Sequence, residues 1–138
     1  MSLLLLLTLV FGIIEFGHAF NVYQVMTNTA REGARFAVAP CPFASSIGST
    51  CTAGQLPSIS AVQSYAVGFH NSGSVYCPGG IGDVSCISVN PNYQPSTDPV
   101  NGVTLTYTQV TVSYPFTFYF FSYRPTITTD AVMRNETN

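Results

Sequence analysis

The chain has 138 residues, only 7% of them charged, and a formal net charge of −2. It has no lysine and only four arginines, so it lacks the clustered positive charge that nucleic-acid binding requires, and that class of function is excluded. The two histidines lie far apart and the carboxylates are scattered, so we expect no enzyme, no catalytic residue, no metal site and no cofactor.

The N-terminal segment is a nearly unbroken apolar run from residue 3 to residue 14. Continued to Phe20, it reaches the roughly 20 residues that span a bilayer. No Lys or Arg precedes the run and no small-x-small cleavage site follows it, which disfavours a cleaved signal peptide. Copies of the same chain are the simplest partner for such a helix. We therefore expect residues 1–38 to form one helix that assembles through these side chains: Leu5, Phe11, Ile14, Glu15 and Phe16.

Glu15 is the unusual residue of this helix. A carboxylate between Ile14 and Phe16 is costly in apolar surroundings unless it is paired or protonated. Its candidate partners are His18, a cation of a neighbouring copy, or a proton. Alternatively, Glu15 marks the boundary where the helix leaves the membrane for water, and both interpretations stay open.

From Ala19 onward, apolar and small residues recur at helical spacing, which predicts a face packed against the rest of the chain. The last turns of this face carry residues small enough for close helix–head packing: Ala30, Gly33 and Ala37. The helix should end near Val38, because the residue before Pro40 is biased away from helical backbone.

Two segments of this helix carry a family resemblance. Residues 11–17 read FGIIEFG and residues 28–35 read NTAREGAR. On spacing alone, Arg31, Glu32 and Arg35 form a solvated face in which Glu32 pairs with Arg35. Together the two segments resemble the signature of TadE-like pilins of the tight-adherence (Tad/Flp) type IV pilus systems. The resemblance covers residues 3–38 strongly, and residues 61–66 and 131–134 weakly.

The resemblance implies a structural pilin subunit. Such a chain would sit in the inner membrane, be extracted by the pilus assembly machinery and polymerise through its N-terminal helix into an extracellular, adhesive helical homo-oligomer at the cell surface. The alternatives are a minor pilin or membrane-anchored assembly protein that does not form the filament body, and a surface binding module tethered by its helix. Prepilins of the family usually carry a peptidase site, with Gly and a Glu five residues after it. No such site precedes Leu3 here and Glu15 lies too deep, so whether Met1 is a processed end stays open.

Residues 39–138 are expected to form a disulfide-stapled, β-rich head, which makes the chain α+β and type IV pilin-like. The cysteines form two local pairs, Cys41 with Cys51 and Cys77 with Cys86, and we expect sequential bonds. Each bond would stabilise the fold by roughly 2–3 kcal/mol. A metal site of all four cysteines is disfavoured because no C-x2-C spacing is present. Disulfides indicate an oxidising compartment.

One short helix is expected in the head, between Ser58 as N-cap and the stop signal at residues 71–73. Its apolar residues at 59, 62, 65 or 66, and 69 predict the inward face. His70 in the last turn suits the negative end of the helix dipole better than a metal site.

Three strands are expected, over residues 84–89, 103–121 and 126–135, the last pairing antiparallel with 103–115 against the inner half of the long helix. Asn90-Pro91 should end the first strand. A change in alternation near Thr108-Gln109 predicts a bulge in the second strand, and Pro115 a break in its ladder. The aromatic stretch 116–123 should pack on the helix or on a neighbour. Asn135 begins an Asn-Glu-Thr sequon, a candidate glycosylation site.

Overall fold

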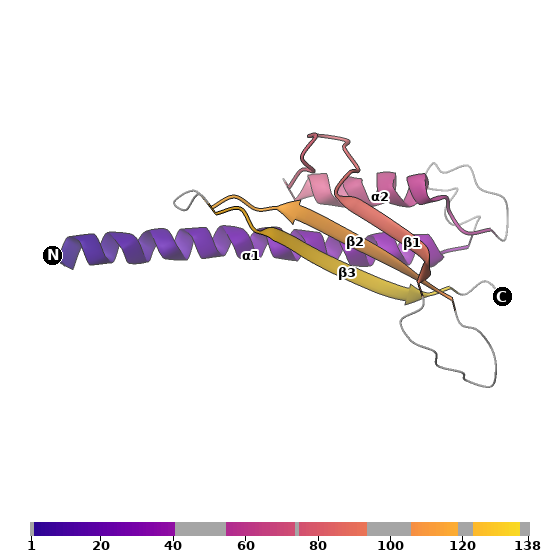
Figure 1. Ribbon diagram of the computed structural model, residues 1–138, viewed down its shortest axis with the longest axis horizontal. Helices are drawn as coiled ribbons and strands as arrows, with labels where there is room; N and C mark the ends of the chain where they lie inside the picture. Colours follow the sequence, from indigo (N-terminus) through magenta and orange to yellow (C-terminus); the bar gives the residue numbers. More distant parts are fainter. Residues whose placement is uncertain (1, 41–54, 74, 94–105, 119–122, 136–138) are drawn as a thin grey trace, which may run out of the picture.

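The computed structural model describes residues 2–40, 55–73, 75–93, 106–118 and 123–135. The elements follow in the order α1 (Ser2–Val38), α2 (Ile59–Ser72), β1 (Ile87–Tyr93), β2 (Tyr107–Pro115) and β3 (Thr126–Arg134). The expected α+β class, with a long N-terminal helix, one short helix and a small antiparallel sheet, is confirmed. The N-terminal half of α1 projects beyond the head, while its C-terminal half lies along the sheet (Figure 1).

Helix α2 begins at the predicted cap, because the Ser58 hydroxyl oxygen accepts a hydrogen bond from the Ala61 backbone N–H at 3.3 Å. Its inward face is rotated from the predicted one: positions 62 and 66 are buried as expected, but Ile59 and Phe69 are exposed. The buried residues are Val62, Ala66, Val67 and His70. Phe69 stays partly in solvent, where its ring packs edge-on against Tyr65, 5.2 Å away.

The sheet has the order β1-β2-β3, with antiparallel pairing at both interfaces. On the central strand β2, Thr108, Val110 and Val112 are buried, and the two residues between them, Gln109 and Thr111, are half-buried and polar. Both helices cover this inner face, α2 beside β1 and α1 beside β2 and β3. The head is therefore a two-layer unit whose outer face is largely hydroxyl and amide side chains.

Three predictions about the strands are wrong. β1 does not end at Asn90-Pro91 but continues to Tyr93, and the register shift lies between Asn90 and Tyr93 of β1 rather than at Thr108-Gln109. Pro91 has no N–H to give to the ladder, so an extra residue is accommodated in this edge strand. The second strand, expected over residues 103–121, ends earlier: β2 pairs with β3 without interruption from Tyr107 to Pro115, and the described residues 116–118 are outside the ladder.

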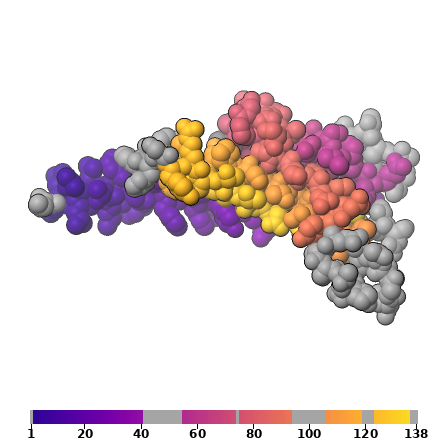
Figure 2. Space-filling view, in the orientation of Figure 1, coloured from indigo at the N-terminus to yellow at the C-terminus, as the bar shows by residue number. Residues whose placement is uncertain are grey.

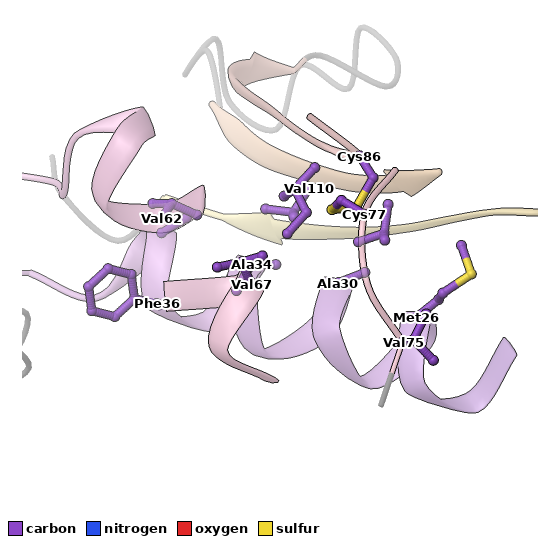
Figure 3. Close-up of a cluster of buried hydrophobic side chains, with 14 of the residues drawn as sticks. Met26, Ala30, Ala34, Phe36, Val62, Val67, Val75, Cys77, Cys86 and Val110 are labelled. Carbon is purple, nitrogen blue, oxygen red and sulfur yellow. A yellow bond between two sulfur atoms is a disulfide. The ribbon is translucent and has the colours of Figure 1, made fainter. Parts of the chain in front are cut away.

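The core joins all of these elements around the inner half of α1 (Figure 3). Met26 and Ala34 of α1, Ala66 of α2 and Val110 of β2 are fully enclosed. Phe116, just after β2, is also buried. This agrees with the expectation that the aromatic stretch packs against the helix. Burial of each large apolar side chain here contributes roughly 1.5–3 kcal/mol.

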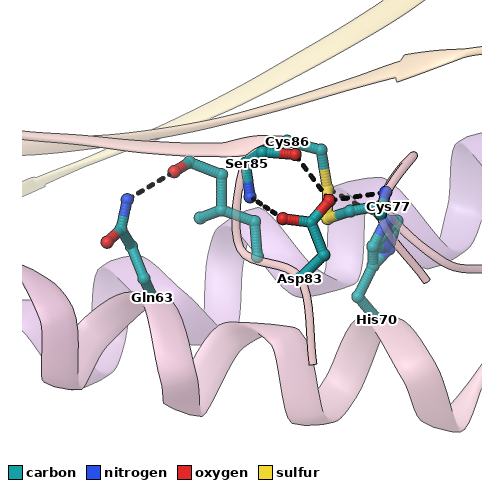
Figure 4. Close-up of a disulfide and its surroundings, with 8 residues drawn as sticks. Gln63, His70, Cys77, Asp83, Ser85 and Cys86 are labelled. Carbon is teal, nitrogen blue, oxygen red and sulfur yellow. Dashed lines mark hydrogen bonds between the residues drawn. A yellow bond between two sulfur atoms is a disulfide. The ribbon is translucent and has the colours of Figure 1, made fainter. Parts of the chain in front are cut away.

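The described residues contain one disulfide, Cys77–Cys86, which closes the loop before β1. Cys41 and Cys51 lie outside the described residues, so the second expected bond stays a prediction. The loop is also held by the Asp83 carboxylate, which accepts hydrogen bonds from the Ser85 hydroxyl and from the backbone N–H groups of Ser85 and Gly79 (Figure 4). These bonds, that from the Ser85 hydroxyl first, hold the pKa of Asp83 below its usual value.

Asn135 ties together the ends of the strands. Its side-chain oxygen accepts a hydrogen bond from the Thr108 hydroxyl at 2.7 Å, and its Nδ2 donates to the Pro91 carbonyl oxygen at 3.3 Å. Glycosylation would use the same amide nitrogen, so a glycan on the folded head would have to break the bond to Pro91. Modification of Asn135 stays a prediction.

Asn135→Ala should lower the free energy of unfolding of the head by about 2 kcal/mol, because Thr108, only 2% exposed, loses its hydrogen-bond acceptor. Urea denaturation in detergent measures this change. The matched control is Asn21→Ala, since Asn21 lies exposed on α1 and should tolerate the change. Equal stabilities of the two variants would show that the Asn135 contacts contribute nothing.

Candidate assembly segment of the N-terminal helix

Residues 2–14 of α1 are exposed on every side of the helix. Leu5 and Ile14 are 68% and 61% exposed, and Phe11 and Phe16 also reach solvent. Figure 2 shows the outer end of this indigo segment projecting beyond the head. A helix that is apolar all round is expected inside a protein assembly or a membrane, because in water it would expose a large unpaired apolar surface.

Among the described residues, α1 is the one helix long and apolar enough to cross a membrane. Its most apolar 18-residue window has a mean hydropathy of 2.1, and only 6% of that window is buried in the structure. Such a window is about 27 Å long at helical rise, close to the thickness of a bilayer core. The low burial distinguishes this segment from the core helix of a globular domain.

Glu15 lies where the projecting half of α1 meets the head. It is only 6% exposed, although its neighbours Ile14 and Phe16 are 61% and 74% exposed. Ala19 follows it after four residues and Val22 after seven, so Glu15 is the first member of the stripe that faces the head. The carboxylate is thus covered within its own chain. The spacing of Glu15, Ala19 and Val22 could have predicted this burial from the sequence, whereas its neighbours Ile14 and Phe16 favoured a role in assembly.

The stretch after β2 packs against α1 one turn beyond Glu15. The ring of His18 lies 5.3 Å from that of Phe116, which in turn packs edge-on against Phe118 at 4.9 Å. These contacts attach the stretch after β2 to the helix beside the junction. The pairing of Glu15 with His18 or with a neighbouring copy stays a prediction.

The small residues of the inner stripe lie at the junction of α1 with α2 and β2. Ala30 and Ala37 are buried, and Gly33 lies between them on the same face. A Cβ atom at Gly33 would lie 3.2 Å from both Ala66 Cβ and Val110 Cγ1. Glycine therefore lets the helix approach the second helix and the central strand more closely than any other residue would.

The charged residues of the NTAREGAR segment border a groove of about 560 Å³ between α1 and β3. Arg35 Nη1 lies 3.4 Å from Glu32 Oε1, so the predicted ion pair is present. Both side chains are substantially exposed, and such a pair contributes only about 0.3–0.5 kcal/mol. Asp130 of β3 lines the same groove, a neighbour that the local sequence could not indicate.

The comparisons with known proteins identify the same segment. Residues 1–35 match the family model of the TadE-like proteins. No curated protein and no solved structure matches the chain. The resemblance inferred from the FGIIEFG and NTAREGAR segments is therefore confirmed for the N-terminal helix. The head lies outside the matched residues, so its description depends on the structure alone.

Proposed function

We propose that the chain is a structural pilin subunit, because its N-terminal helix matches the model of the TadE-like proteins. It would reside in the inner membrane before assembly and then polymerise through α1 into an extracellular filament. The observation that carries the proposal is the projecting half of α1, which is apolar all round and largely exposed to solvent among the described residues.

Transfer of this helix from lipid to a filament core is physically reasonable. Neighbouring copies of α1 offer the same apolar surroundings as lipid tails, so the exchange leaves no apolar surface in water. Association between such helices depends on packing, to which small residues contribute by permitting close approach. The projecting half and its junction carry two, Gly12 and Gly17, and a Cβ at either would meet nothing within 4 Å in the chain. Each glycine costs roughly 0.5–1 kcal/mol of helix stability relative to alanine, and close contact with another copy would offset that cost.

The surface and the disulfide of the head support a structural role outside the cytoplasm. Its outer sheet face carries mostly hydroxyl and amide groups, with Asp130 and Arg134 of β3 as its charges, which suits a surface that either packs against neighbours or faces water. The disulfide Cys77–Cys86 is typical of a chain that leaves the cytoplasm. Structural and adhesive activity, rather than catalysis, is therefore what we propose for it.

Electron microscopy of fibres sheared from cells, combined with gel analysis, tests this proposal. The chain should be the dominant band of the fibres. If it is confined to the detergent-soluble membrane fraction as single particles, the filament proposal fails and the alternative of a minor pilin or a membrane-anchored assembly protein holds.

Glu15→Gln should reduce fibre yield while leaving the head folded. The physical reason is that Glu15 lies covered at the junction between the projecting segment and the head, where the course of the segment is set. A neutral amide would weaken the charge-assisted interactions of the carboxylate there, and such bonds contribute about 1.5–3 kcal/mol each. Fibre yield from sheared cells and the thermal unfolding of the purified chain measure the two effects. Glu32→Gln, which changes a half-exposed carboxylate on the same helix, is the matched control. Normal yield from Glu15→Gln would contradict a role for this charge in assembly.

A further inference from the structure

A cluster of three donor side chains lies on the inner side of the stapled loop, away from the assembly segment. His70 of α2 is completely buried, and Cys77 and Cys86 are 2% and 7% exposed. The Nε2 atom of His70 lies 3.6 Å from Cys86 Sγ, and the donor atoms of all three residues lie within 4.8 Å of one another. In Figure 4 the imidazole ring faces the disulfide.

The ring of His70 packs edge-on against Tyr114 at 6.2 Å, but one of its two nitrogens is left without a partner in the described part of the chain. Burial lowers the pKa of His70. Nδ1 has no hydrogen-bond partner among the described residues, and an apolar side chain would avoid that cost.

We propose that the dithiol form of this loop binds one Zn²⁺ ion through Cys77 Sγ, Cys86 Sγ and His70 Nε2. This inference does not depend on the proposed function. The disulfide and the metal would be alternative cross-links for the same junction of α2, the loop and β1.

The observed separation of the donor atoms suits the metal. In a tetrahedral zinc site, a nitrogen and a sulfur ligand lie about 3.6 Å apart and two sulfurs about 3.8 Å apart. The His70 nitrogen is already at the first of these separations from Cys86 Sγ. The Cα atoms of Cys77 and Cys86 are 5.4 Å apart, so rotation of the side chains can separate the sulfurs without a large backbone movement.

The loop has a second restraint that does not require the disulfide. The three hydrogen bonds to the Asp83 carboxylate connect Gly79 with Ser85, inside the pair of cysteines. They should keep Cys77 and Cys86 close together after reduction. The ligand set would then be largely formed before the ion arrives.

The chemistry balances with a phosphine as reductant. The phosphine and one water convert the disulfide to two thiols and are themselves converted to the phosphine oxide. Zn²⁺ then displaces the two thiol protons to solvent and takes water as its fourth ligand. The two thiolates cancel the charge of the ion, so the buried complex is neutral and avoids the cost of an uncompensated charge.

The test uses the full chain in detergent with Cys41→Ser and Cys51→Ser, so that only one cysteine pair remains. After reduction with a phosphine, anaerobic titration with Co²⁺ should give thiolate-to-cobalt absorption at one equivalent, and Zn²⁺ should displace the cobalt. His70→Gln should weaken Co²⁺ binding by roughly 100-fold or more, since even an outer-shell change costs 10–100-fold. His18→Gln changes the other histidine and is the matched control. The oxidised chain should not bind.

Two results would overturn the assignment. One is a reduced, folded chain that binds no Co²⁺, and the other is a His70→Gln variant that binds as tightly as the His18→Gln control. If reduction unfolds the head, circular dichroism replaces the titration as the readout. Zn²⁺ should then restore folding of the reduced chain but not of His70→Gln, and failure to restore it also refutes the site.

Discussion

Leu9→Arg should remove the chain from both membrane and filament while leaving the head folded. Leu9 is 57% exposed in the middle of the projecting half of α1. An arginine at the centre of a membrane-spanning helix costs about 2.5–3.5 kcal/mol, or roughly a hundredfold in the insertion equilibrium. In a helix bundle it would be buried without a partner. Membrane fractionation, fibre yield and thermal unfolding of the head measure the three expected effects.

Ile81→Arg is the control for this experiment. Ile81 is 83% exposed on the stapled loop of the head, where an added charge stays in water. We expect normal insertion, normal fibres and unchanged stability from it, because surface substitutions usually shift stability by less than about 0.5 kcal/mol. A Leu9→Arg variant that assembles as well as the Ile81→Arg variant would show that the projecting apolar surface is not the assembly surface.

Gly33→Leu should destabilise the head by about 3 kcal/mol. A Cβ alone would already lie 3.2 Å from Ala66 Cβ and from Val110 Cγ1, and neither neighbour can swing aside, because one is a methyl on α2 and the other belongs to the central strand. A leucine there must push α1 away from the inner face, and overpacking of this kind costs about 1–3 kcal/mol or more. Urea denaturation of the purified chain measures the change.

Gly17→Leu makes the same change on the same helix. Nothing lies within 4 Å of a Cβ at Gly17, so the head should be as stable as the unchanged chain, or slightly more stable because leucine favours helix. If the two leucine variants unfold at the same urea concentration, close packing at Gly33 is not what holds the helix to the head. A loss of fibres from Gly17→Leu with a stable head would place Gly17 in a contact between copies.

Local patterns in the sequence were enough to predict much of this protein. The apolar run, the spacing of small residues and Pro40 determine a single helix that ends at Val38. Ser58 as a cap and the antiparallel pairing of the last strand were likewise predictable, and so was the short Cys77–Cys86 loop. Each of these features depends on residues that are near in the chain, or on the periodicity of one element.

Contacts between distant segments settled the rest, because burial is a property of the packed chain rather than of a window of sequence. They cover Glu15 on the head side of α1, rotate α2 so that His70 rather than Phe69 is enclosed, and confine the irregularity to Pro91 on an edge strand. The Asn135 bonds and the imidazole beside the disulfide likewise join residues far apart in the chain. No periodicity could have indicated them, since they arise only when the sheet closes over the helices.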